Sequence, residues 1–211
     1  MLEERIFGMP SSFWDHMPRQ ERRDWALAVA RDTSDHVSIW RGLAQDWYVW
    51  DFNRHDQWKP IFKRARAAWT LDVFSDAQRE MYEALPDKLT IYRGCNKDIR
   101  HGHRRLSWTL DQDVAHWFAR LGGWRNDDGV PVVYTGALDK KDVALVFDGR
   151  EYEIVPCDAM AIRDIAAVPL DELAAKRHDR RKKSTDWCEG GEEQAKRRRR
   201  KLIRDSLKLA A

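Results

Sequence analysis

The stretch GREYEIVP, residues 149–156, places two glutamates on either side of a tyrosine, directly before a run of aliphatic residues. The aliphatic run predicts a β-strand that opens with the glutamates. Because side chains at positions i and i+2 of a strand point to the same face, Glu151 and Glu153 are expected to lie side by side. Two neighbouring carboxylates resist ionising together unless a cation or a hydrogen-bond donor is supplied. The stretch therefore predicts a partner for the pair.

Three uses of this pair are open from the stretch alone. The pair could ligate a metal, although two carboxylates are few ligands and no histidine stands at a metal-site spacing. It could be a surface feature that Arg150 neutralises. It could also serve glycosidic chemistry, in which one carboxylate faces a cationic transition state and the other acts on the incoming nucleophile.

The composition is that of a polar chain with enough residues for one domain with appendages: 211 residues, of which 35% are charged. No apolar run approaches the ~18 residues of a membrane span and no signal peptide is recognisable, so we expect a cytoplasmic protein with no membrane partner. The three cysteines form no Cys-x-x-Cys pair, which argues against a disulfide framework and a zinc site. Most of the eleven tryptophans are expected in the core.

Positive charge is concentrated near the end of the chain. Residues 176–208 contain fourteen Lys or Arg and six Asp or Glu, a net charge of +8, whereas the whole chain carries +3 and the remainder therefore −5. Such a segment is typical of a solvated helix, but it also attracts nucleic acid or an acidic partner. All three interpretations stay open here.

The chain divides into three expected parts: a helical region over residues 1–86, a strand-rich core over 87–168 and a basic helix with its tail over 169–211. In the first part, helices are expected to begin at Pro18 and Pro60, with a helical pattern over 35–58 between them. Ser75 and Gln78 have the spacing of a capping box.

The middle part predicts an α+β arrangement of strands around one helix. The helix over 111–121 is expected to end at Gly122-Gly123, which leaves Trp124 in a loop where it could close over a ligand. The five expected strands are 89–94, 104–110, 130–138, 142–147 and 151–155.

Two further groups of polar residues lie on these expected strands. Arg93 ends the first strand, where its guanidinium could clamp a phosphate, and Gly94 leaves room for a close approach. Ser107 and Thr109 flank Trp108 and place two hydroxyls on one strand face.

In this order, IYRG (91–94), SWTLDQDVAHWFA (107–119) and EYEIVP (151–156) resemble the Arg-Ser-Glu branch of the ADP-ribosyltransferases, in which the last motif is Glu-x-Glu. The resemblance spans residues 89–156. It departs from the family pattern at Trp108, where the family has a small residue. It implies an ADP-ribosyltransferase-like split β-sandwich with a cleft for NAD, and an enzyme that cleaves NAD between nicotinamide and ribose.

The resemblance also implies roles for single residues. Arg93 would hold a phosphate of NAD, and Gly94 would offer backbone contacts to the nicotinamide amide. Ser107 would brace Glu153 by a hydrogen bond, and Thr109 would support the same strand. Glu153 would be the catalytic glutamate that binds the ribose 2′-hydroxyl and stabilises the oxocarbenium ion.

Glu151 would orient or deprotonate the acceptor as a general base. A glutamate at this position resembles the members that modify protein arginine, which is therefore the first acceptor to test. RNA or DNA aided by the basic tail, water, and a non-enzymatic nucleic-acid-binding role remain alternatives. A small enzyme of this kind resembles a toxin, a defence component or a phage-encoded modifier, for which an inhibitor or antitoxin is a conceivable partner.

Overall fold

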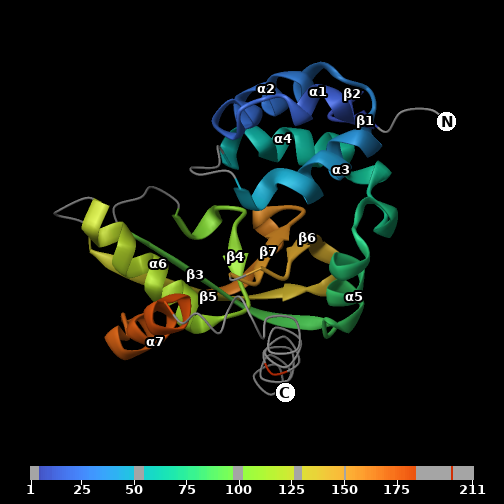
Figure 1. Cartoon of the computed structure of the whole chain (residues 1–211). Helices are drawn as coiled ribbons and strands as arrows, with labels where there is room; N and C mark the ends of the chain where they lie inside the picture. The colour runs from blue at the N-terminus through green and yellow to red at the C-terminus, as the bar shows by residue number, and fades with distance from the viewer. Residues whose placement is uncertain are drawn as a thin grey trace. The chain divides into compact units, whose positions relative to one another are not determined.

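The computed structural model describes residues 5–49, 55–96, 102–125, 130–149, 151–183 and 201 (Figure 1). The chain forms two compact units, residues 1–79 and 80–211. The boundary between them falls inside one helix, α5 (Asp76–Ala84). The second unit contains every motif residue of the strand-rich core together with the helix that opens the basic segment.

The first unit is built from helices and one short hairpin. Its elements in chain order are β1 (Arg5–Ile6), β2 (Met9–Pro10), α1 (Ser11–Asp15), α2 (Arg19–Asp32), α3 (His36–Asp46), the 3-10 turn η1 (Trp47–Val49), α4 (His55–Ala65), η2 (Arg66–Ala68), η3 (Leu71–Val73) and the start of α5.

Indole rings form the centre of the first unit. Two of them satisfy their ring N–H groups inside the core: Trp14 donates to the carbonyl of Ile6 and Trp40 to that of Ala65, each at 2.8 Å. Six of the nine tryptophans in the described ranges are buried in the core: Trp14, Trp40, Trp47, Trp58, Trp108 and Trp117. The predicted core role is thus confirmed for these six.

The helix signals of the first unit are confirmed at two places and wrong at a third. Pro18 precedes α2, and Ser75 and Gln78 exchange capping-box hydrogen bonds at 3.1 and 3.4 Å. Pro60, however, lies inside α4 instead of opening it. The helix keeps this proline because burial of its apolar face, including Ile61 and Phe62, offsets the one backbone hydrogen bond that proline cannot donate.

The second unit is organised around one six-stranded antiparallel sheet. The strands lie side by side in the order β6-β7-β4-β3-β5-β8. The strands and helices of this unit are β3 (Lys88–Asn96), η4 (Gly102–Arg104), β4 (Trp108–Thr109), α6 (Gln112–Arg125), β5 (Pro131–Asp139), η5 (Lys140–Asp142), β6 (Val143–Phe147), β7 (Glu153–Pro156), η6 (Ala159–Ala161), β8 (Arg163–Val168) and α7 (Glu172–Lys183). The α+β class expected from the sequence is confirmed.

The longest pairing of the sheet joins β3 to β5. It runs without interruption from Lys88 opposite Asp139 to Asn96 opposite Pro131. The edge strand β8 was not expected, because most of its residues are exposed and it shows no clean alternation of apolar and polar side chains. Five of the six strands of this sheet were predicted from the sequence.

Helix α6 covers β3 and β5, and α7 packs against α6 (Figure 1). Ala115 and Ala119 are fully buried against Val133 of β5, with Tyr92 beside them. The expected end of α6 at Gly122-Gly123 is wrong, since the helix continues to Arg125 and includes Trp124. Glycine weakens a helix interior by about 1 kcal/mol but does not force an end. The loop position expected for Trp124 is therefore wrong.

Candidate functional site

The sheet brings the three motifs onto three adjacent strands. Arg93 lies on β3, Thr109 on β4 and Glu153 on β7, and β4 lies between the other two. Thr109 is opposite Tyr92 on one side and Glu153 on the other. Residues directly opposite in an antiparallel pair share a face, so Tyr92, Thr109 and Glu153 form one row across the sheet.

Arg93 follows Tyr92, so strand alternation starts its side chain on the other face. Its Nε donates to the carbonyl of Gly102 at 2.9 Å, and its Nη1 donates to the carbonyl of Ser107. Removal of this guanidinium from water lowers the pKa of Arg93 to about 10, an effect that Cys95 and Glu153 oppose and Arg105 reinforces. The negative charge of Glu153 thus raises the pKa of Arg93, while the Arg93 guanidinium donates hydrogen bonds to two backbone carbonyls.

The serine motif contributes mainly backbone contacts and one hydroxyl. Ser107 meets Arg93 through its carbonyl, so the expected brace from its hydroxyl to Glu153 stays a prediction. Thr109 is buried; its hydroxyl donates to the carbonyl of Glu151 and accepts from the backbone N–H of Asp111 at 3.0 Å. Thr109 thus ties the start of the last motif to the entry of α6, which agrees with a supporting role for it.

The two glutamates do not sit on one regular strand as expected. β7 begins at Glu153, whereas Glu151 lies in the preceding turn. Between them Tyr152 has φ of 45° and is buried, with 1% of its surface exposed. A left-handed residue reverses the local alternation, so the i, i+2 argument for a shared face does not apply here. Both glutamates are half-buried, Glu151 just before the start of β7 and Glu153 at its first residue.

The space above Gly94 belongs to α6. A Cβ at this position would lie 1.8 Å from the carbonyl oxygen of Ala115 and 2.5 Å from the backbone nitrogen of Ala119. The close approach for which this glycine provides is that of a helix backbone. The implied backbone contact from Gly94 to nicotinamide stays a prediction.

Trp108 is a core residue, as expected. It is buried, and its ring N–H donates to the carbonyl of Arg105 at 2.8 Å. The large residue at the position where the family has a small one therefore packs away from solvent and fixes the segment before β4.

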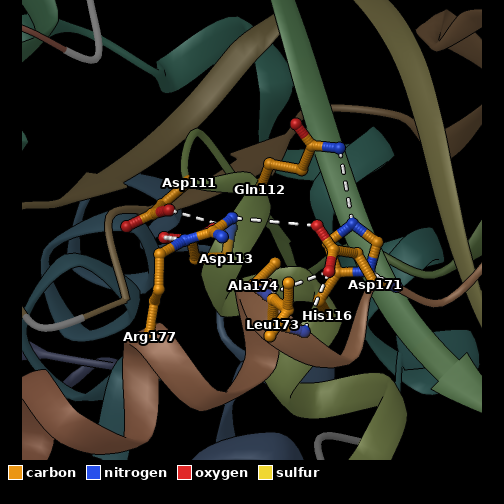
Figure 2. Close-up of polar contacts among 8 residues, drawn as sticks. All are labelled: Asp111, Gln112, Asp113, His116, Asp171, Leu173, Ala174 and Arg177. Atoms are coloured by element: carbon orange, nitrogen blue, oxygen red, sulfur yellow. Dashed lines mark hydrogen bonds and ion pairs between the residues drawn. The ribbon is translucent and has the colours of Figure 1, made fainter.

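A second polar cluster joins α6 to α7 (Figure 2). His116 of α6 accepts a 3.0 Å hydrogen bond at Nδ1 from the backbone N–H of Asp171, the residue that caps α7. Arg177 of α7 reaches back to Asp113 of α6 through two hydrogen bonds, of 2.8 and 3.3 Å. The two contacts attach the first two turns of α7 to α6.

His116 is buried, with only 1% of its surface exposed. Burial lowers its pKa; the charges of Asp171 and Asp113 oppose this shift and that of Arg177 adds to it. Because Nδ1 accepts a hydrogen bond from the backbone N–H of Asp171, the neutral ring carries its proton on Nε2. His116 is therefore a neutral acceptor that holds the start of α7.

Sequence reasoning missed Arg105 and the α6–α7 cluster. Arg105 stands in a basic run just before the serine motif, and that position was its available signal. The cap of α7 could have been found from Asp171, which precedes Glu172 and Leu173 in an N-cap pattern. The pairing of His116 with that cap depends on how α7 folds back and had no local signal.

The chain matches no protein-family model, no curated protein and no solved structure. Within the described ranges, no helix is both long and apolar enough to cross a membrane. Those ranges also contain no group of three metal-ligating side chains.

Proposed function

We propose that this protein is a mono-ADP-ribosyltransferase that cleaves NAD and transfers ADP-ribose to a macromolecule, with protein arginine as the first acceptor to test. The observation that carries the proposal is the row Tyr92–Thr109–Glu153 across β3, β4 and β7, which brings the three sequence motifs onto neighbouring strands. A split β-sandwich with an NAD cleft is part of the same proposal.

The electrostatics of the site support a role for Glu153 in this chemistry. Its carboxylate is close enough to Arg93 to raise the pKa of that guanidinium. A residue of the first motif thus interacts electrostatically with a residue of the last, sixty positions further along the chain. In the proposed reaction, the bond from ribose C1′ to the nicotinamide nitrogen breaks and its electron pair leaves with nicotinamide. Glu153 stabilises the positive charge that develops on the ribose.

Glu151 acts on the other side of the same carbon. The acceptor nitrogen or oxygen forms the new bond to C1′, and its proton passes to Glu151 or through it to water. The turn that holds Glu151 is fixed by Thr109, whose hydroxyl donates to the carbonyl of Glu151. The two glutamates thus occupy separate positions, a turn and a strand start, suited to separate tasks.

The decisive test compares the wild type with Glu153→Gln and Glu151→Gln during incubation with labelled NAD and cell lysate. We expect Glu153→Gln to lower nicotinamide release by about 10²–10³-fold, because the neutral amide cannot stabilise the cation. We expect Glu151→Gln to release nicotinamide but to retain less label on the acceptor. Glu83→Gln, an exposed glutamate of the same unit, is the matched control.

Treatment of the labelled lysate with protease or nuclease identifies the acceptor. Protease-sensitive label supports protein modification, nuclease-sensitive label moves the acceptor to RNA or DNA, and nicotinamide release without retained label indicates an NAD glycohydrolase. Absence of nicotinamide release by the wild type in every portion would contradict the enzymatic proposal.

A non-enzymatic nucleic-acid-binding protein is the second candidate, favoured by the net charge of +8 over residues 176–208. Binding through such a segment neutralises phosphates and therefore weakens steeply as salt rises. Salt-sensitive binding of single-stranded DNA that Glu153→Gln leaves unchanged, together with no NAD cleavage, would select this alternative.

A further inference from the structure

The buried residue between the two glutamates has an unusual backbone conformation. Tyr152 has φ of 45°, although only 1% of its surface is exposed. A bulky residue rarely adopts this left-handed region, and such strain persists only where the surrounding contacts impose it. Contacts on both sides of Tyr152 must therefore hold this conformation.

These contacts come mainly from the joint between β4 and α6. The hydroxyl of Thr109, the last residue of β4, donates to the carbonyl of Glu151. The backbone N–H of Leu110 donates to the carbonyl of Tyr152 at 3.1 Å, and the N–H of Tyr152 donates to the carbonyl of Gly149 at 3.2 Å. Both peptide groups that flank the Cα of Tyr152 are thus hydrogen-bonded, which fixes the two backbone dihedrals between them.

The residue that follows is held on a regular strand. Glu153 pairs with Thr109 of β4 on one side and with Phe147 of β6 on the other. Extended backbone through Tyr152 would place Glu151 and Glu153 on one face. The left-handed residue interrupts this alternation, so the backbone of Tyr152 sets the position of Glu151 relative to Glu153.

We propose that Tyr152 is a positioning residue, whose left-handed backbone holds Glu151, on the acceptor side of the reaction, apart from Glu153. The tasks of the two glutamates rest on the proposed function, whereas the backbone constraint does not. Separation suits two such tasks, because neighbouring carboxylates oppose each other's ionisation. The positioning is a property of the backbone conformation and not of the tyrosine ring.

Two substitutions that both remove the ring separate backbone conformation from packing. Asparagine adopts the left-handed region more readily than most residues with a side chain, whereas valine, with its branched Cβ, is strongly disfavoured there. Valine is the better replacement at a buried position, because burial of a polar amide is costly. A packing role predicts that Tyr152→Val retains more function than Tyr152→Asn, and the positioning role predicts the reverse.

The first measurement is the transfer fraction, the label retained on the acceptor divided by the nicotinamide released, for the full chain with labelled NAD and cell lysate. We expect Tyr152→Val to lower it about 10²-fold and Tyr152→Asn to lower it less than about threefold, because a small misplacement of a reacting group is costly. Nicotinamide release should fall much less than the transfer fraction in Tyr152→Val, because β4 and β6 still hold Glu153.

The second measurement, amide hydrogen exchange of Leu110, needs no NAD. The N–H of Leu110 donates to the carbonyl of Tyr152, so we expect its exchange to be about tenfold faster in Tyr152→Val and unchanged in Tyr152→Asn. Asp164→Val is the matched control, because Asp164 is exposed, has φ of 52° and lies on β8, which β4, β3 and β5 separate from β7. This control imposes the same kind of strain and should change neither measurement.

A second variant tests the same constraint if Tyr152→Val does not fold. Thr109→Val keeps the shape of the side chain but removes the hydroxyl that holds the carbonyl of Glu151. We expect it to lower the transfer fraction in the same direction. An unchanged transfer fraction in Thr109→Val would contradict the positioning role.

The outcomes distinguish this proposal from the proposed function. A transfer fraction in Tyr152→Asn that is equal to or below that of Tyr152→Val would overturn the positioning role and leave NAD cleavage in place. Unchanged exchange of Leu110 in Tyr152→Val would overturn the backbone constraint. Nicotinamide release without retained label in the wild type would reject a role on the acceptor side, and no release at all would reject the proposed function together with the positioning role.

Discussion

A single methyl group added at Gly94 is expected to disrupt the packing of α6 on β3. We expect Gly94→Ala to lower the free energy of unfolding by about 3 kcal/mol or more, because the added Cβ would lie 1.8 Å from the backbone oxygen of Ala115. Neither the helix backbone nor the paired strand β3 can shift freely to relieve this contact. Urea unfolding measures the change.

The matched control is Gly149→Ala, since a Cβ there meets no atom within 4 Å. We expect this variant to unfold within about 0.5 kcal/mol of the wild type, as is usual for exposed positions. Equal stability of the Gly94→Ala and Gly149→Ala variants would contradict the close packing of α6 on β3.

His116 makes stability depend on pH. Its folded-state pKa lies below the ordinary 6.5, so below that pH the unfolded chain takes up a proton that the folded ring resists. Stability is therefore expected to be complete above about 6.5 and to fall as the pH drops from there toward the lowered value. Protonation at Nδ1 would also remove the acceptor for the N–H of Asp171.

Urea unfolding between about pH 8 and 5 measures this dependence. His116→Gln is expected to flatten it, because an amide does not titrate, whereas Lys176→Gln on the exposed face of α7 should retain the slope. A slope that is identical in the wild type and in His116→Gln would show that another group controls acid sensitivity in this range.

At the scale of elements, α7 depends on its first residues. Asp171 accepts hydrogen bonds from the N–H groups of Leu173 and Ala174, at 2.9 and 3.1 Å, and these bonds lower its pKa. We expect Asp171→Ala to fray the first turn of α7, because both N–H groups lose their acceptor. Amide hydrogen exchange of Leu173 and Ala174 measures this fraying.

Asp158→Ala is the matched control for the α7 cap. Asp158 also caps a turn, accepting from the N–H of Met160 at 2.9 Å, but that turn is η6. We expect faster exchange at Met160 in this variant with no change in α7. Unchanged exchange of Leu173 in Asp171→Ala would mean that packing on α6 alone holds the helix start.

Elements with strong local signals could be predicted, and those whose ends depend on packing could not. The capping box at Ser75 and the strand 89–94 follow from local hydrogen bonds and alternation. The extension of α6 beyond Gly122 and the place of Pro60 inside α4 had no such signal. In both helices, tertiary packing outweighs a local cost of a few kcal/mol.

At the scale of the whole molecule, the two compact units have separate cores, so their stabilities should separate. We expect Trp40→Ala to cost about 3–5 kcal/mol in the first unit, because its fully buried ring leaves a cavity. Hydrogen exchange should rise in α3 and α4 while the sheet of the second unit keeps its protection.

Trp25→Ala is the control for this prediction, since 49% of Trp25 is exposed. It should change exchange in the first unit much less than Trp40→Ala. Equal loss of protection in β3 and α3 on substitution of Trp40 would show that the two units unfold as one.

The candidate site was predictable as a set of residues but not as an arrangement. Arg93, Thr109 and Glu153 were chosen from three short motifs, and the sheet order places their strands next to one another. The relation between Glu151 and Glu153 was not predictable, because it depends on the left-handed conformation of Tyr152. The contacts of Arg93 with two carbonyls likewise required the fold of segment 102–107.

The sequence by itself determined the α+β class, most strands of the sheet, the aromatic core of the first unit and the residues worth testing, because alternation, capping and burial preferences act over a few neighbouring residues. Only the tertiary structure decided which strands are adjacent, that α6 rests on Gly94, that His116 holds α7, and that Arg93 holds the segment before the serine motif. These features join residues tens of positions apart, and such contacts are set by the packing of whole elements rather than by local preference.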